Sequence, residues 1–127
     1  MEVVITYPKA LISVLTVTPP VLHQETLLEK IVGKAKATIW LQIIKHPFKG
    51  KIKVYLEQTK VDEIDVDAQL PGFYKYVSRY FDVPGVCKET DDGIYCRARA
   101  YTVTAELYDS EGNKISEMKT KIWVSLF

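Results

Sequence analysis

Apolar and polar residues alternate along most of this chain with a period of two residues. Over residues 35–44, the odd-numbered positions are alanine, isoleucine or leucine, and the even-numbered positions are polar residues together with Trp40 and Ile44. We call each such set of alternate positions a parity. Similar alternation recurs over residues 52–56 and 101–108. Because successive side chains of a strand point to opposite faces of a sheet, this pattern predicts half-buried β-strands.

Turn signals divide the pattern into segments. Residues 35–57 indicate a hairpin that turns at 46–50, and residues 101–124 indicate a second hairpin that turns at 109–113. In the second hairpin the apolar parity changes between Ile115 and Met118, which predicts a β-bulge there. Residues 73–83 indicate one further strand.

The N-terminal third is less regular. Residues 3–18 indicate an edge strand that breaks at Pro8 and resumes. Prolines precede residues 21–32 and a glycine follows them, so this segment fits either a short helix or a loop with an edge strand. The whole pattern, with about seven or eight strands, predicts an all-β protein: a single antiparallel β-sandwich domain over residues 1–127.

The two predicted hairpins resemble the B–C and F–G hairpins of immunoglobulin-like and fibronectin-like accessory modules. The resemblance covers about half of the chain and implies an immunoglobulin-like sandwich with a structural or adhesive role. Residues 91–96 also resemble the segment before the second cysteine of immunoglobulin domains. However, Tyr95 and Cys96 are adjacent here, and no cysteine lies near residues 39–41, so the disulfide of that family is not expected.

Cys87 and Cys96 flank a short polar segment, which predicts a disulfide across the base of a loop, with two unpaired thiols as the alternative. Two cysteines without a nearby histidine supply only half of a zinc shell, so no metal is expected. The acidic run Asp62, Glu63, Asp65 and Asp67 indicates a solvated strand that resists edge pairing, or a calcium site.

The amino-acid composition argues against several classes of function. The 127 residues carry 17 basic and 16 acidic side chains, a balance that argues against nucleic-acid binding. No apolar run approaches the roughly 20 residues of a membrane span, and no signal peptide is expected. The single asparagine and the abundance of isoleucine, valine, lysine and glutamate are typical of hyperthermophiles.

Catalytic groups are scarce. His23 and His46 are the only histidines, and no nucleophile motif or phosphate-binding glycine loop occurs. We therefore expect no enzyme activity and no cofactor.

Apolar residues on both faces of the predicted strands are the most informative feature. A sandwich buries one face of each sheet, so the second face needs a cover. That cover is residues 21–32, a loop or another protein chain, and a large apolar surface left over marks an interface. The predicted interface residues are Trp40, Ile44, Tyr74, Tyr76, Trp123 and Phe127.

These observations favour a non-catalytic structural or assembly protein that forms a homo-oligomer. A virion coat or decoration component, or a surface-layer module, of a hyperthermophilic archaeon or its virus would fit. A virion or an extracellular surface is then favoured over the cytoplasm. The alternative is a monomeric binding module for a partner protein, as an inhibitor or adaptor, or for a small apolar ligand.

Overall fold

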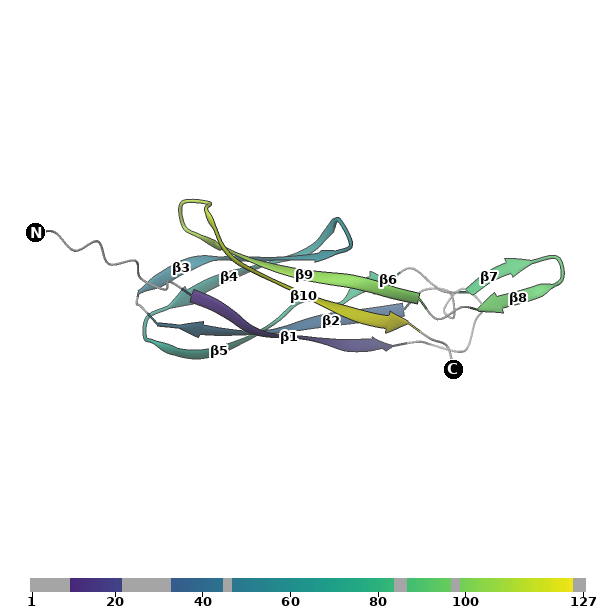
Figure 1. Ribbon diagram of the computed structural model, residues 1–127, viewed down its shortest axis with the longest axis horizontal. Helices are drawn as coiled ribbons and strands as arrows, with labels where there is room; N and C mark the ends of the chain where they lie inside the picture. Colours follow the sequence, from purple (N-terminus) through teal and green to yellow (C-terminus); the bar gives the residue numbers. More distant parts are fainter. Residues whose placement is uncertain (1–9, 22–32, 45–46, 84–86, 97–98, 125–127) are drawn as a thin grey trace, which may run out of the picture.

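A computed structural model of the protein describes residues 10–21, 33–44, 47–83, 87–96 and 99–124. All secondary-structure elements in these ranges are strands (Figure 1). The described residues therefore contain no helix that could cross a membrane. The strands are β1 (Ala10–Val21), β2 (Gly33–Ile43), β3 (Phe48–Leu56), β4 (Thr59–Ala68), β5 (Gly72–Val77), β6 (Phe81–Val83), β7 (Cys87–Thr90), β8 (Gly93–Cys96), β9 (Arg99–Asp109) and β10 (Lys114–Val124). The all-β prediction is confirmed, with more strands than expected because β6, β7 and β8 are separate elements.

Two antiparallel sheets form the sandwich. Sheet A has the order β1-β2-β5, with β6 also paired to β2, and sheet B has the order β10-β9-β3-β4. Strands β7 and β8 form a separate hairpin that extends beyond the two sheets (Figure 1). At one side of the sandwich, the end strand β1 of sheet A contacts the end strand β10 of sheet B. The other end strands, β5 of sheet A and β4 of sheet B, therefore lie at the other side. This distribution of consecutive strands over two sheets is that of an immunoglobulin-like sandwich.

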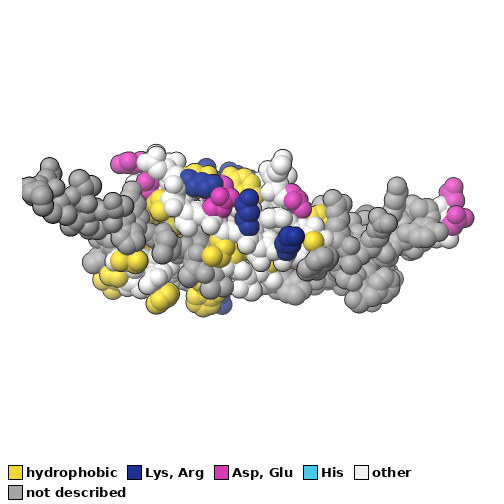
Figure 2. All heavy atoms as spheres, in the orientation of Figure 1, with side chains coloured by type: hydrophobic (Ala, Val, Ile, Leu, Met, Phe, Trp, Pro, Cys, Tyr) yellow, Lys and Arg dark blue, Asp and Glu magenta, His cyan; other side chains and the backbone are white. Residues whose placement is uncertain are grey.

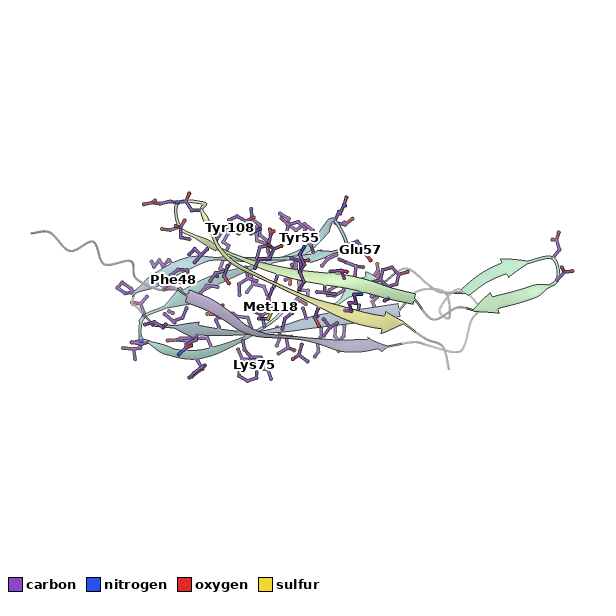
Figure 3. All side chains as sticks on the ribbon, in the orientation of Figure 1. Phe48, Tyr55, Glu57, Lys75, Tyr108 and Met118 are labelled. Atoms are coloured by element: carbon purple, nitrogen blue, oxygen red, sulfur yellow. The ribbon has the colours of Figure 1, made fainter. Side chains whose placement is uncertain are left out.

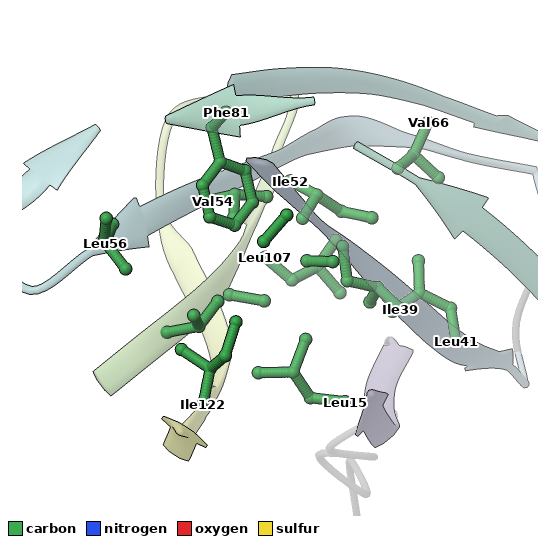
Figure 4. Close-up of a cluster of buried hydrophobic side chains, with 14 of the residues drawn as sticks. Leu15, Ile39, Leu41, Ile52, Val54, Leu56, Val66, Phe81, Leu107 and Ile122 are labelled. Atoms are coloured by element: carbon green, nitrogen blue, oxygen red, sulfur yellow. The ribbon is translucent and has the colours of Figure 1, made fainter. Parts of the chain in front are cut away.

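The side chains that point inward from the strands of both sheets fill the space between them. Figure 4 shows this core, in which Ile39 and Leu41 of β2 face Ile52 and Val54 of β3 across the layers. The positions predicted to point inward in β2, β3 and β9 are buried, as expected. Burying one such side chain stabilises the fold by about 1.5–3 kcal/mol.

The prediction that residues 35–57 form a hairpin is wrong. Strand β2 pairs with β1, β5 and β6, whereas β3 pairs with β4 and β9. The chain therefore passes from one sheet to the other between β2 and β3. Period-two alternation looks the same whether two consecutive strands pair or face each other, so the pattern alone could not distinguish these arrangements.

The predicted strand over residues 73–83 is divided into β5 and β6 by a bend at Ser78. The Ala37 amide donates a hydrogen bond to Ser78 Oγ (2.7 Å), and the Ser78 amide donates to the Ala37 carbonyl (2.9 Å). The serine hydroxyl therefore accepts the bond that a regular ladder carbonyl would accept, which lets the strand bend without leaving a buried amide unsatisfied.

Other expectations about the strands are confirmed. Strands β9 and β10 form the predicted hairpin, and their register shifts between Lys114 and Ser116, at the expected bulge. Strand β1 is an edge strand of sheet A, as predicted for the resumed part of the N-terminal segment. Residues 3–9 and the ambiguous segment 22–32 lie outside the described residues.

Candidate functional site

Large exposed apolar side chains gather on one side of the sandwich. All of those whose side chains the structure describes lie on β2, on β5, or in the residues that flank these strands. They are Trp40 (37% exposed), Ile44 (43%), Leu70 (66%), Phe73 (71%), Val77 (44%) and Tyr80 (56%). Among the sheet B side chains that the structure describes, which do not include that of Trp123, no large apolar one is exposed.

The pairing of β2 with β5 explains this arrangement. The inward residues Ile39 and Leu41 lie opposite Tyr76 and Tyr74, so the intervening residues of both strands point outward. The outward positions along this pairing are Thr38, Trp40 and Gln42 on β2, and Phe73, Lys75 and Val77 on β5. We call Trp40, Phe73 and Val77 the apolar face.

Lys75 is the one charged side chain among these outward positions. It lies opposite Trp40 in the register, and its ammonium is 5.6 Å from the centroid of the Trp40 ring. Figure 3 shows Lys75 pointing away from the sandwich, on the side opposite Tyr108. A cation over an indole ring is attracted by the ring electrons, so the lysine is compatible with an aromatic surface.

The outer face of sheet B has the opposite character. The Lys114 ammonium lies 3.1 Å from a Glu106 carboxylate oxygen and 3.0 Å from one of Glu117, and the Tyr108 hydroxyl donates to Glu106 (2.8 Å). Burial raises the pKa of Glu106, but the hydrogen bonds from Tyr108 and Lys114 outweigh burial, so the pKa is lowered overall. In Figure 2, blue and magenta side chains gather over β10, and yellow ones lie along the lower rim where β5 runs.

An open hollow of about 540 Å³ lies on this charged face. Lysines of β3 and carboxylates of β4 line it together, with the Tyr108 ring at one wall. The Lys53 ammonium lies 4.3 Å from the centroid of that ring. Because cations and anions alternate across the hollow, its charges largely compensate one another.

The structure separates the predicted interface residues. Trp40 and Ile44 are exposed, whereas Tyr74 and Tyr76 are half-buried on the opposite face of sheet A, against the core. Phe127 and the side chain of Trp123 lie outside what the structure describes. Trp40 and Ile44 are therefore not joined by the two tyrosines into one surface.

Phe73 and Val77 were not among the predicted interface residues. The alternation of β5 was visible, but both of its faces carry aromatic residues, so the pattern did not show which face is buried. Tyrosine is at home in either place, because its ring packs against apolar groups and its hydroxyl reaches water.

The acidic run has two different environments. Glu63, Asp65 and Asp67 are exposed on the edge strand β4, as predicted for a solvated strand, but Asp62 is buried, and there the prediction is wrong. Its carboxylate accepts hydrogen bonds from the Arg79 amide (2.6 Å) and from Arg79 Nε (3.0 Å). This contact ties β4 of sheet B to the bend that follows β5 of sheet A.

Other candidate chemistry is sparse in the described ranges. No group of three or more histidine, cysteine, aspartate or glutamate side chains in these ranges is placed to hold a metal ion. Both histidines, His23 and His46, lie outside the described residues.

The predicted disulfide concerns the projecting hairpin. The register of β7 and β8 places Cys87 directly opposite Cys96. We expect the purified chain to be lighter by two hydrogen atoms without reductant than with it, and the bridge to stabilise the hairpin by about 2–3 kcal/mol in the chain-entropy model. Intact mass spectrometry after alkylation tests this expectation. Alkylation of both thiols without reductant would contradict it.

Comparison with known proteins bears on the fold alone. No protein-family model matches the sequence, and no curated protein matches it. Several solved structures resemble the sandwich. One of them is a GH2 beta-galacturonidase from Eisenbergiella tayi bound to galacturonate, with a TM-score of 0.64 and 14% sequence identity. The match covers 89% of this chain but 18% of that enzyme chain, so it supports a β-sandwich domain fold.

Proposed function

We propose that this chain is a non-catalytic β-sandwich module that works by assembly with further copies of itself, as a component of a virus coat or a surface layer does. The apolar face of sheet A is the observation that carries this proposal. Apolar patches on soluble domains mark sites of protein contact, and aromatic residues are enriched in the buried centres of interfaces. Trp40 and Phe73 supply both features at diagonally neighbouring positions of β2 and β5.

The charge on the apolar face favours another copy of this chain as its partner. Among the six outward positions of the β2 and β5 pairing, only Lys75 is charged, and its ammonium lies over the Trp40 ring. Each of two such faces brings a single ammonium, which lies over an indole ring, so a contact between copies desolvates few charged groups. The outer face of sheet B is a poorer candidate, because its charged groups would lose solvation on contact.

Replacing Phe73 with serine tests the proposal. We expect native mass spectrometry over a range of concentrations to find oligomers of the wild-type chain, and about tenfold weaker assembly of Phe73→Ser, because a large exposed ring no longer becomes buried. Lys119→Ser, on the outer face of sheet B, is the matched control and should assemble like the wild type. A wild-type chain that stays monomeric at every concentration would contradict the proposal.

The alternative is a monomeric module that binds a different protein through the same face. It predicts a monomer whose Phe73→Ser variant is unchanged in mass but impaired in binding that partner. A small apolar ligand between the sheets is less well supported. The hollow described above lies outside the sandwich, and buried side chains occupy the core.

A further inference from the structure

Among the described residues, no strand covers the side of the sandwich formed by β4 and β5, which we call the open side. Strand β4 ends sheet B and β5 ends sheet A, and in the part of the chain that the structure describes no strand pairs with their outer edges. Residues 69–71 alone connect the two strands, and Asp62 holds Arg79 at the other end of the pair. Free strand edges carry unpaired backbone groups that can accept a strand from another chain.

The charges on the two open edges are opposite. Strand β4 presents three exposed carboxylates, Glu63, Asp65 and Asp67, each opposite a lysine of β3 on its other side. The exposed charge of β5 is the ammonium of Lys75. Like charges placed directly opposite each other destabilise a strand pair, and opposite charges stabilise it. Pairing β4 with a second β4 would bring carboxylates together. Pairing β5 with β4 of another copy brings cation and anion together.

One two-fold rotation generates two such β5–β4 pairs between the copies. A two-fold axis parallel to the strands exchanges the two layers, so β5 of one copy comes to lie in the same layer as β4 of the other. Strands β4 and β5 run in opposite directions because a short connection joins them across the layers. Rotation about an axis along the strands preserves direction, so the new pairs are antiparallel.

The same symmetry also fixes the register. Rotation about this axis causes no shift along the strands, so each residue of β5 meets the residue that lies at its own level on β4. Because only residues 69–71 connect the strands, we infer that Gly72 lies level with Ala68, and the contact of Asp62 with the Arg79 amide supports a similar level at the far end. Counting along both strands from the connection, Lys75 is level with Asp65.

We propose that two copies of this chain join along the open side as a two-fold dimer, in which β5 of each copy pairs antiparallel with β4 of the other. Lys75 then lies between its own Trp40 and the partner subunit's Asp65. This inference rests on the proposed function, because it names the first step of the assembly.

The dimer also covers apolar groups that a single copy leaves partly exposed. Tyr74 and Tyr76 of β5 and Ile64 of β4 are half-buried at the margin of the core. In the same register, Tyr74 lies beside the partner subunit's Val66, and Tyr76 beside the partner subunit's Ile64, on the inner side of the joined sheets. The two apolar faces of the dimer then point to opposite sides, where each can meet a further copy.

Charge reversal at the proposed pair tests the dimer. We expect Lys75→Glu alone and Asp65→Lys alone each to raise the dissociation constant of the dimer about 30-fold, since each variant replaces two attractive pairs by two repulsive ones. Mixing the two variants should restore a heterodimer of nearly wild-type affinity, because both contacts again join opposite charges. Analytical ultracentrifugation or native mass spectrometry measures these constants, and circular dichroism checks that each variant is folded.

Lys121→Glu is the matched control. It reverses a charge on β10, at the closed side of the sandwich, and should leave the dissociation constant unchanged. Oligomers that respond to Phe73→Ser but not to either charge reversal would overturn this dimer and leave the assembly proposal standing. A wild-type chain that is monomeric throughout would overturn both. Loss of the dimer in both single variants without recovery on mixing would also overturn the pairing of Lys75 with Asp65.

Discussion

Gly50→Ala is expected to lower the free energy of unfolding by about 3 kcal/mol, because the added methyl group collides with backbone. Gly50 lies in β3, where β4 and β9 flank it on both sides. A Cβ at this position would lie far inside van der Waals contact of the Tyr108 carbonyl oxygen, and 3.2 Å from a ring carbon of Phe48. The carbonyl belongs to a paired strand and cannot rotate away as a side chain could, so the sheet itself must shift.

Lys49→Ala is the control for this experiment. It changes the preceding residue of the same strand, where the side chain is exposed, and we expect a change within about 0.5 kcal/mol. Urea denaturation followed by circular dichroism measures both variants. If Gly50→Ala proved as stable as the wild type, the close approach of β9 to β3 at this residue would be refuted.

The sequence predicted which residues face the core more reliably than which strands are neighbours. Alternation depends on one strand at a time, so the buried parity of β2 and the bulge after Lys114 could both be inferred from local pattern. The partners of a strand depend on residues far away in the chain. For this reason, the passage from β2 in one sheet to β3 in the other was mistaken for a hairpin.

The candidate site was predicted only in part, for a related reason. Trp40 was recognised because an indole on the polar parity of a strand is unusual. Phe73 was not, because the tyrosines on the other face of β5 looked equally suited to an interface. Asp62 was assigned to solvent with its neighbours, since its partner Arg79 lies 17 residues further along the chain and only the fold brings the two together.

Asp62→Ala is expected to lower the free energy of unfolding by about 3 kcal/mol, because it leaves backbone donors without an acceptor. The carboxylate accepts from the amides of Arg79 (2.6 Å) and Glu63 (2.8 Å), and the Arg79 guanidinium lies 3.0 Å from it. The arginine side chain is 82% exposed, so its charge contributes less than the two amides do. Asp67→Asn, at an exposed position of the same strand, should change stability by less than about 0.5 kcal/mol.

The contribution of Asp62 is also expected to depend on pH. Burial raises the pKa of this carboxyl, but hydrogen bonds from the backbone amides of Arg79 and Glu63 and from the Arg79 side chain outweigh burial, so the folded pKa lies below its ordinary value. The unfolded chain therefore binds this proton more readily than the folded one. The contribution should be fully present above about pH 4, the ordinary aspartate range, and should disappear as the pH falls through the folded pKa.

Comparing the wild type with Asp62→Asn isolates this dependence from that of other carboxyls, such as Glu106. The amide keeps the shape of the side chain but cannot lose a proton, so the difference in unfolding free energy between the two proteins should shrink on acidification. A difference that stays constant from neutral to acidic pH would mean that the Asp62 carboxylate is not stabilised by Arg79. The bend would then have to be held by Ser78 and its two hydrogen bonds to Ala37. In that case nothing but the short connection would keep β4 level with β5, and the register of the proposed dimer would lose one of its two supports.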